Sequence, residues 1–269
     1  NLILSDETEE GSRSNVHHAR EYPNAITFLQ GLNPPVRFIA TTATATQAAR
    51  TAIKEKLKFG PTNSSLKFNP RESYSYELIL PIYRENIEIQ VLPRTSKQRN
   101  LQFLVAERHC KQTGRRLEPL PEGVGLTLIY VTKRDTARQI AKVLEQGGLK
   151  VGLYYKEGRS NAENAAAHQA FMDSTIDVLV ATGQSFGEGI DHPELRHVIL
   201  YCMPKSLEQL VQQIGRPGRD GKRARCTVFA AAQDFMEAGH TPNSRALLGQ
   251  FLEATTTCRW HTLSRLCGE

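Results

Sequence analysis

Hydrophobic positions between residues 126 and 230 alternate between two kinds of spacing. The run Leu126–Val131 is almost continuously apolar, as expected of a strand buried on both faces. The segment after it carries Ala137, Ile140, Ala141 and Leu144 at i, i+3, i+4 and i+7, the spacing of one buried helix face. The same two patterns recur along the chain and predict strands at Val151–Tyr155, Ile176–Ala181, His197–Tyr201 and Cys226–Ala230, and helices at Asn161–Met172 and Ser206–Ile214.

Polar residues at the ends of these segments predict where two of the helices begin and end. Thr132 is the predicted N-cap of the first helix, and the Gly147-Gly148 pair is predicted to end it. Ser206 is predicted to cap the last helix, with Gln209 at the capping-box position. The apolar spacing in this last helix predicts a buried face made of Leu207, Leu210, Val211 and Ile214. The predicted outward-facing residues are Gln209, Gln212 and Gln213.

This alternation predicts an α/β fold with a parallel sheet that helices cover on both faces. Ligands in such sheets bind at the carboxyl ends of the strands, so the loops there are the first place to look for chemistry. Two polar, glycine- and proline-containing stretches interrupt the pattern, and we expect a connector at Phe59–Arg71 and a surface loop at Lys111–Gly125. After Asp234 the pattern becomes helical.

The charge distribution favours a polyanionic ligand. The chain has 34 Lys and Arg against 28 Asp and Glu, and the excess gathers between residues 205 and 225. A clustered excess of this kind suits nucleotide phosphate or nucleic acid, although a solvated basic face has the same composition. The basic residues of this stretch are Lys205, Arg216, Arg219, Lys222, Arg223 and Arg225, against the acidic Glu208 and Asp220.

Cysteine usage and hydropathy predict the environment of the protein. The five cysteines form no CxxC pair, which favours reduced thiols and an intracellular, reducing location. The sequence shows no signal-peptide pattern, and no apolar run reaches the roughly 18–20 residues of a membrane span, so no membrane partner is expected.

The strongest chemical signal is QQIGRPGRDGK at residues 212–222. A glycine- and proline-framed turn here carries Arg216 and Arg219, and an arginine on a rigid turn can stabilise a phosphoryl transition state. The string closely resembles motif VI of RecQ-like DNA helicases, QxxGRxGRDG. DEAD-box RNA helicases have histidine where Gln212 stands, which makes them the second choice. The resemblance implies that Gln212, Arg216 and Arg219 bind ATP and that Arg219 is the catalytic arginine finger.

Two further segments of the second half resemble motifs of the same family. ATGQSFGEGIDHP at residues 181–193 is similar to motif V, although it has one extra residue before Phe186 and an acidic Glu188 at an apolar position. This resemblance implies that Thr182 contacts the nucleic-acid backbone and that Gly189 and Asp191 approach ATP. The segment at Thr132, Lys133 and Arg134 resembles motif IV, and a basic helix N-terminus is suited to phosphate.

The first part of the chain resembles the end of the first helicase motor domain. ATTATA at residues 40–45 is similar to motif III, which implies nucleic-acid contacts at Thr42 and Thr44. The strand-like LILSDE at residues 2–7 has the form of motif II. By resemblance Asp6 holds Mg²⁺ through water and Glu7 activates the attacking water. Tyr22 stands sixteen residues after Asp6, as the family's pattern requires.

Two segments resemble the borders of the second motor domain. IYRENI at residues 82–87 matches the FxRxNI that opens this domain in RecQ-like proteins. Cys258-Arg259 and the terminal LCGE resemble the start of the family's zinc domain, where Cys258 would be the first of four Zn²⁺ ligands. The other three would follow Glu269, so a zinc site is expected only in a longer chain and Cys258 is a free thiol in this one.

The resemblance implies three parts: a remnant of the first RecA-like domain with a linker (1–78), a second RecA-like motor domain (79–233), and the start of a zinc-binding region (234–269). The implied activity is ATP-driven 3′-to-5′ unwinding of DNA in repair and recombination, in the nucleus or nucleoid. ATP and Mg²⁺ would lie between this motor domain and an upstream RecA-like half.

The sequence leaves two alternatives to this activity open. The 269 residues contain no GxxxxGK[ST] phosphate-binding loop, so the chain alone is expected to be catalytically incomplete. One alternative is therefore a degenerate, non-catalytic helicase fragment that binds DNA or a protein. The other is an RNA helicase of the same superfamily.

Overall fold

The computed structural model describes residues 28, 31, 46–57, 59, 77–94, 125–156, 158–182, 192–231, 234 and 240–268. The chain divides into two compact units: one comprises Asn1–Ile82 with Ser264–Glu269, and the other is Tyr83–Leu263. The predicted connector and surface loop lie almost wholly outside the described residues. So do six predicted site residues, namely Asp6, Glu7, Thr42, Thr44, Gly189 and Asp191.

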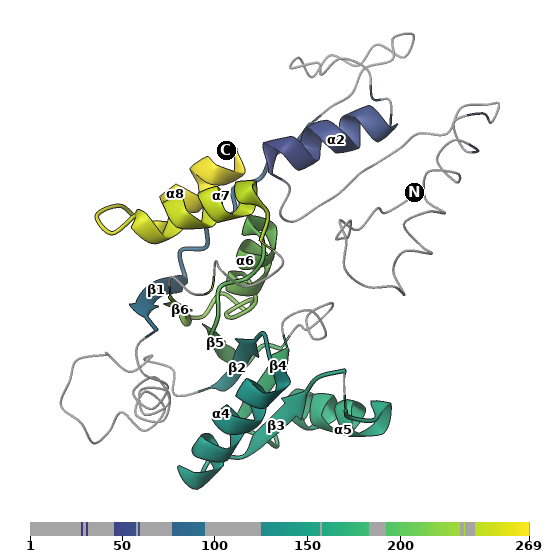
Figure 1. Ribbon diagram of the computed structural model, residues 1–269, viewed down its shortest axis with the longest axis vertical. Coiled ribbons are helices and arrows are strands. Elements are labelled where there is room, and N and C mark those ends of the chain that lie inside the picture. The colour runs from purple at the N-terminus through teal and green to yellow at the C-terminus, as the bar shows by residue number, and fades with distance from the viewer. Residues whose placement is uncertain are drawn as a thin grey trace. The chain divides into compact units, whose positions relative to one another are not determined.

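The larger unit is built on a six-stranded sheet in which every pair of neighbouring strands is parallel. The strand order is β1-β6-β5-β2-β4-β3 (Figure 1), so the predicted α/β fold with a parallel sheet is confirmed. The sequence pattern had not indicated β1. The strands are β1 (Ile87–Pro93), β2 (Leu126–Val131), β3 (Val151–Tyr154), β4 (Val178–Thr182), β5 (Leu195–Leu200) and β6 (Ala224–Ala230).

Three helices connect these strands and cover both faces of the sheet. Going from β2 to β3, α4 (Arg134–Gln146) crosses the sheet in one direction. The connections through α5 (Asn161–Met172) and α6 (Leu207–Ile214) run in the opposite direction. Because such crossovers are right-handed, α4 lies on one face and α5 and α6 lie on the other.

Core packing agrees with this assignment of faces. Val178 and Val180 of β4 belong to the same buried cluster as the apolar stripe of α4. Their neighbour Leu179 points the other way, and a Cβ at Gly152 would meet both Leu179 and Ala167 of α5. Each face of the sheet therefore has its own apolar layer.

The predicted buried stripe of α4 is confirmed, but its predicted N-cap is wrong. Ala137, Ile140, Ala141 and Leu144 are all buried, and the helix ends at Gly147. Lys133 occupies the N-cap position, and no side chain caps the first turn. The hydroxyl of Thr132 donates instead to Sγ of Cys202, 3.6 Å away. Thr132 and Cys202 each lie two residues beyond the paired Tyr130 and Leu200 of the neighbouring strands β2 and β5, so the fold brings them together.

At α6 the cap is confirmed, and one prediction about its surface is wrong. The Ser206 side chain accepts a hydrogen bond from the backbone N–H of Gln209 (3.2 Å). The Gln209 side chain accepts from the N–H of Lys205 (2.8 Å) rather than from Ser206, so the box closes one residue earlier. Gln213 is only 5% exposed, whereas Gln212 faces solvent. The buried stripe is wider than the apolar residues alone predict.

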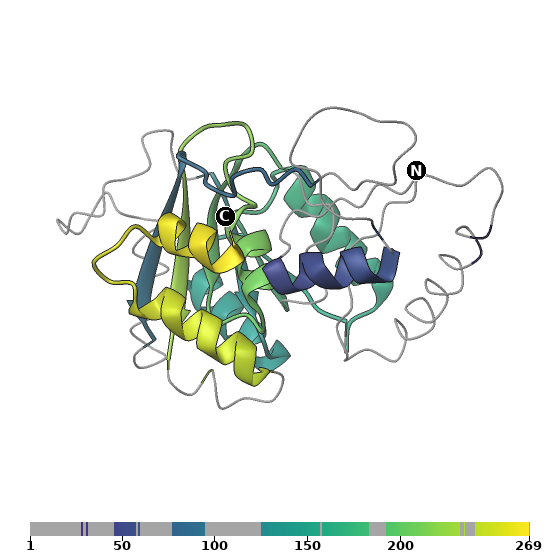
Figure 2. The ribbon, with the colours of Figure 1, turned by 90° about the horizontal axis from the view of Figure 1, so that it is seen from above.

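The helices α7 (Pro242–Glu253) and α8 (Arg259–Cys267) follow the sheet, as the helical pattern after Asp234 predicts. They lie side by side in both views (Figure 1, Figure 2). Arg259 donates to the carbonyl oxygen of Leu252 (3.0 Å), which joins the end of α7 to the start of α8. The indole N–H of Trp260 donates to the carbonyl oxygen of Ile87 (2.9 Å) and so fastens α8 to the start of β1.

The smaller unit contains α2 (Gln47–Leu57). Arg50 on this helix donates to the carbonyl oxygens of Cys267 (2.9 Å) and Gly268 (3.1 Å) and pairs with Glu77. In the part of the chain that the structure describes, no helix is long and apolar enough to cross a membrane.

Candidate ATP and nucleic-acid contacts

The predicted site residues of the larger unit gather at opposite edges of the sheet. Arg216 and Arg219 lie between α6 and β6, so they stand at the amino edge. Thr132 and Thr182 follow β2 and end β4, and Val131 pairs directly with Thr182, so these two threonines share the carboxyl edge. A strand of five to six residues separates the two edges by roughly 15–20 Å.

The motif VI loop, Gly215–Arg223, is called the arginine turn below, and Gly218 is its tightest point. Gly218 has φ +62°, and its N–H donates to the carbonyl oxygen of Leu195 (2.9 Å). Its own carbonyl oxygen accepts from Nη2 of Arg84 and from Nδ2 of Asn86, each at 2.7 Å. A Cβ at this position would stand 2.7 Å from Asn86 Nδ2 and from the carbonyl oxygen of Lys222. Only glycine fits here without displacing the turn.

Asn86 also holds the far end of the arginine turn. Its Nδ2 donates to the carbonyl oxygen of Lys222 (2.8 Å), and its backbone carbonyl accepts from the N–H of Ala224 (2.8 Å). A single residue of the IYRENI segment therefore bonds to two points of the loop that carries Arg219 and to the first residue of β6.

A second anchor lies on the other flank of Arg219. Arg196, with only 6% of its side chain exposed, forms two parallel hydrogen bonds with the Asp220 carboxylate, one of them 2.9 Å from Nη1 to Oδ1. The hydrogen bonds from Arg196 hold the pKa of Asp220 below its usual value. Arg196 also donates to the carbonyl oxygen of Pro193 (2.6 Å), the last residue of motif V.

The two arginines of the turn have opposite surroundings. Arg219 is exposed and sits between the anchored Gly218 and Asp220. Arg216 is 9% exposed and lies beside the hydroxyl of Tyr130 on β2. Burial raises the pKa of Tyr130 to about 12, although the guanidinium of Arg216 acts in the opposite direction. The structure therefore turns Arg219 toward solvent and Arg216 into the interior.

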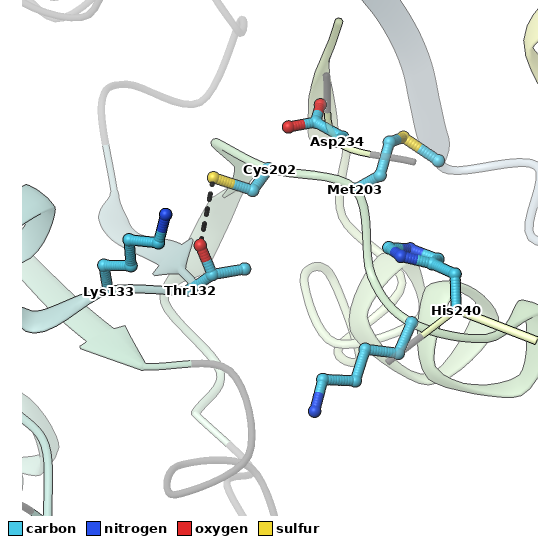
Figure 3. Close-up of a pocket in the computed structure, with 7 residues that line it drawn as sticks. Thr132, Lys133, Cys202, Met203, Asp234 and His240 are labelled. Atoms are coloured by element: carbon cyan, nitrogen blue, oxygen red, sulfur yellow. Dashed lines mark hydrogen bonds between the residues drawn. The ribbon is translucent and has the colours of Figure 1, made fainter. Parts of the chain in front are cut away.

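At the carboxyl edge, the loops after β2, β5 and β6 enclose a cavity of about 190 Å³ (Figure 3). Sγ of Cys202 accepts from Nη1 of Arg94 (3.0 Å) and from the hydroxyl of Thr132, and Arg94 also pairs with the buried Asp234. Burial raises the pKa of both Cys202 and Asp234. The lining residues are Thr132, Lys133, Cys202, Met203, Lys205, Asp234 and His240.

Comparison with known proteins places this geometry in a family. Residues 115–221 match the family of helicase conserved C-terminal domains. The RecQ-like DNA helicase blm-1 of Caenorhabditis elegans is 28% identical over 251 residues, which cover 88% of this chain and 23% of that protein. This chain carries a helicase C-terminal domain and is similar to RecQ-like DNA helicases of superfamily 2.

Two further matches are a protein named as an RNA helicase and a solved structure with a similar fold. A protein of Acanthamoeba polyphaga mimivirus, provisionally named ATP-dependent RNA helicase R290, is 30% identical over 246 residues, 87% of this chain and 40% of that protein. A solved structure of Saccharomyces cerevisiae Dbp5, bound to Gle1 and IP6, superposes with a TM-score of 0.60 at 16% identity and covers 98% of this chain and 60% of that one. The likeness to Dbp5 shows the fold alone. The chain spans less than half the length of these curated relatives.

Some anchoring residues of the motor domain were not singled out as site residues by sequence reasoning. Arg84 and Asn86 belong to the recognised IYRENI segment, but nothing in the sequence shows that they reach the arginine turn. Asp220 is part of the motif VI string, and its partner Arg196 follows motif V without a pattern of its own. Only the fold brings Arg196 and Asp220, 24 residues apart, into contact.

The described residues do not fit a zinc ion. Cys258 is exposed at the start of α8, and no three His, Cys, Asp or Glu side chains among the described residues gather as metal ligands. A closed zinc site needs four ligands.

Proposed function

We propose that this chain supplies the second motor half of an ATP-dependent 3′-to-5′ DNA helicase of RecQ type. The observation that supports the proposal is the environment of Arg219, an exposed arginine whose two neighbours are held by Asn86 and Arg196. Such a guanidinium is preorganised to stabilise the charge that develops on a transferred phosphoryl group. Arg219 is therefore the proposed arginine finger, and the burial of Arg216 favours Arg219 for this role.

The remaining ATP contacts of the proposal come from this chain and from an upstream half. Gln212 is exposed on α6, one turn before the arginine turn, and is proposed as a nucleotide contact. Gly189 and Asp191 of motif V are proposed to approach the same ATP. An upstream RecA-like half is proposed to supply the phosphate-binding loop, and Mg²⁺ at Asp6 would neutralise the phosphates while Glu7 activates the attacking water.

The carboxyl edge of the sheet is the proposed nucleic-acid edge. Thr132, Lys133 and Arg134 follow β2 into the start of α4, and Thr182 ends the adjacent strand β4. Hydroxyl and basic groups of this kind contact phosphates rather than base edges. Thr42 and Thr44 of motif III are proposed to extend the track on the first motor half. Binding of this kind is independent of base sequence, as a translocating motor requires. A DNA-processing role in the nucleus or nucleoid belongs to the same proposal.

A second candidate is an RNA helicase of the same superfamily. It is favoured by the mimivirus relative, whose provisional name is an ATP-dependent RNA helicase. Gln212 favours DNA, because DEAD-box RNA helicases typically have histidine there. A third candidate, a non-catalytic fragment, is favoured by the extra residue before Phe186 and by Glu188 in motif V.

The decisive experiment compares two arginine variants in the protein expressed from its complete reading frame. Arg219→Ala is expected to lower ATP hydrolysis on the order of 10³-fold or more, because an arginine finger acts mainly on transition-state charge. Nucleotide affinity should stay within about threefold, since the finger contributes little to the ground state. The matched control is Arg223→Ala, which removes another exposed arginine of the same turn.

Single-stranded DNA and RNA of equal length then separate the candidates. Stimulation of ATP hydrolysis by DNA alone supports the RecQ-type proposal, and stimulation by RNA alone supports the second candidate. An Arg219→Ala rate within about threefold of the parent would remove Arg219 from the catalytic role. Absence of ATP hydrolysis in the parent would leave the non-catalytic fragment as the remaining candidate.

A further inference from the structure

The arginine turn is held by a residue that is distant in sequence. Asn86 bonds through its side chain to Gly218 and Lys222, which follow it by 132 and 136 residues. Its backbone carbonyl accepts from the N–H of Ala224. These contacts join the first residues of the motor domain to the loop between α6 and β6.

We infer that Asn86 is the positioning residue of Arg219, with Arg84 as its partner. The inference rests on the proposed role of Arg219 and adds how the guanidinium is kept in place. Gly218 and Lys222 flank Arg219 in the sequence, and Asn86 Nδ2 donates hydrogen bonds to the carbonyl oxygens of both. The separation of these two carbonyls is thereby fixed, and with it the direction in which the backbone presents Arg219.

A carboxamide suits this position because its nitrogen carries two N–H donors. Each donor meets one carbonyl oxygen, at 2.7 Å for Gly218 and 2.8 Å for Lys222. An aspartate would place carboxylate oxygens against the same carbonyls, and an alanine would reach neither. Arg84 adds a charged donor to the Gly218 carbonyl at 2.7 Å, which is stronger than a neutral bond.

Asn86 can hold the turn because the residues next to it are themselves fixed. Ile87 pairs in register with Ala224 as the first residue of β1. The N–H of Ile87 donates to the carbonyl oxygen of Arg84 (3.1 Å), and the Ile87 carbonyl accepts from the Trp260 indole. Asn86 is therefore supported by the first residue of β1, which is hydrogen-bonded to both Arg84 and Trp260. Rigid support of this kind keeps a catalytic group in its productive geometry.

The first test is a double-mutant cycle in the protein expressed from its complete reading frame. Asn86→Ala is expected to lower kcat by about ten- to hundredfold, because a displacement near 1 Å can cost that much, while KM for ATP changes less than about twofold. In an Arg219→Ala background, Asn86→Ala should change kcat by less than about twofold, because its effect passes through Arg219. The control Glu85→Gln alters the exposed residue between Arg84 and Asn86 and should match the parent.

A merely structural role predicts a different result. It would lower the fraction of folded protein in both backgrounds, so the two losses would multiply, and this would overturn the inference. If Asn86→Ala does not fold, Arg84→Lys replaces it in the cycle, since this variant keeps the charge and loses the planar donor geometry.

The second test needs no hydrolysis and uses the 269-residue chain. Hydrogen exchange of residues 215–224 should become faster by at least about tenfold in Asn86→Asp. The amides of Gly218, Gly221 and Ala224 are hydrogen-bonded in the parent, and these bonds should open more often when Asn86 no longer holds the loop. Exchange in α4 should not change. Unchanged exchange in the turn would refute the inference. Failure of the protein expressed from its complete reading frame to hydrolyse ATP would instead refute the proposed function, and exchange would still decide whether Asn86 holds the turn.

Discussion

At the scale of single residues, the two arginines of the arginine turn are expected to have different roles, Arg216 in stability and Arg219 in catalysis. Arg216 is buried beside Tyr130, whereas Arg219 is exposed. We expect Arg216→Ala to lower the free energy of unfolding by about 1–3 kcal/mol, because it removes a buried side chain and its contacts. Arg219→Ala should change it by less than about 0.5 kcal/mol, as for most exposed positions. Urea denaturation of the two variants measures this difference, and equal losses would contradict the burial of Arg216.

Asp220 predicts a dependence of stability on pH. Its pKa in the folded protein is lowered, first by the hydrogen bonds from Arg196, whereas in the unfolded chain it titrates near about 3.9. A lowered folded pKa contributes stability that is present above the unfolded pKa and is lost as the pH falls through the folded one. Asp220→Asn should therefore be less stable than the parent at pH 7, and the difference should shrink below about pH 4. A difference that is constant from pH 7 to pH 2.5 would contradict the Arg196 pair.

At the scale of elements, the shape of the arginine turn depends on two glycines with unequal surroundings. Gly218 and Gly221 both have positive φ, +62° and +83°. A Cβ on Gly221 would meet nothing within 4 Å, whereas on Gly218 it would stand 2.7 Å from the Lys222 carbonyl oxygen and 2.8 Å from the Ala224 Cβ.

Alanine variants at these two positions separate backbone strain from overpacking. Gly221→Ala is expected to cost about 1–2 kcal/mol of stability, the strain of a left-handed backbone. Gly218→Ala should cost roughly 1–3 kcal/mol more, because overpacking adds to the strain. Thermal unfolding of the two variants gives the comparison, and similar losses would mean that the turn rearranges freely.

At the scale of the whole molecule, the 269-residue chain is expected not to hydrolyse ATP by itself. It contains Arg219 but no GxxxxGK[ST] sequence, and the backbone and lysine of that loop bind the β- and γ-phosphates. Phosphate release should therefore stay at background in a purified sample. Turnover that Glu7→Gln abolishes would contradict this expectation.

The same chain is expected to bind single-stranded DNA weakly and with strong dependence on salt. Contacts to a few phosphates place the affinity near the micromolar range, and log K should fall by about 0.7 per phosphate for each unit of log salt. Lys133→Ala should reduce that slope by about 0.7, whereas Lys150→Ala, at the amino edge before β3, should leave it unchanged. Fluorescence anisotropy at several salt concentrations measures the slopes. A flat salt response would favour a protein-binding fragment.

Local pattern predicted the elements of the sheet well. The stripe of α4 from Ala137 to Leu144 follows from helical periodicity, which depends only on residues three or four positions apart. The helix α5 has the predicted limits, and the structure adds a capping box between Ser160 and Glu163 at its start. Strand ends were less accurate: β4 begins at Val178 and β5 at Leu195, each two residues from the predicted start, because pairing with neighbouring strands decides where a strand begins. The cap at Thr132 was wrong for a similar reason, since a distant cysteine takes its hydroxyl.

The sequence by itself determined the parallel α/β core and the position of the motif VI turn, because both depend on residues close together in the chain. It also predicts phosphate-binding chemistry for that turn. Tertiary structure decided which arginine of that turn is exposed, and that Asn86 and Arg196 hold it. These choices depend on hydrogen bonds between residues 24 to 136 positions apart. Pairs of residues so far apart produce no periodic pattern in the sequence. They form only because the strand order brings β1, β5 and β6 together.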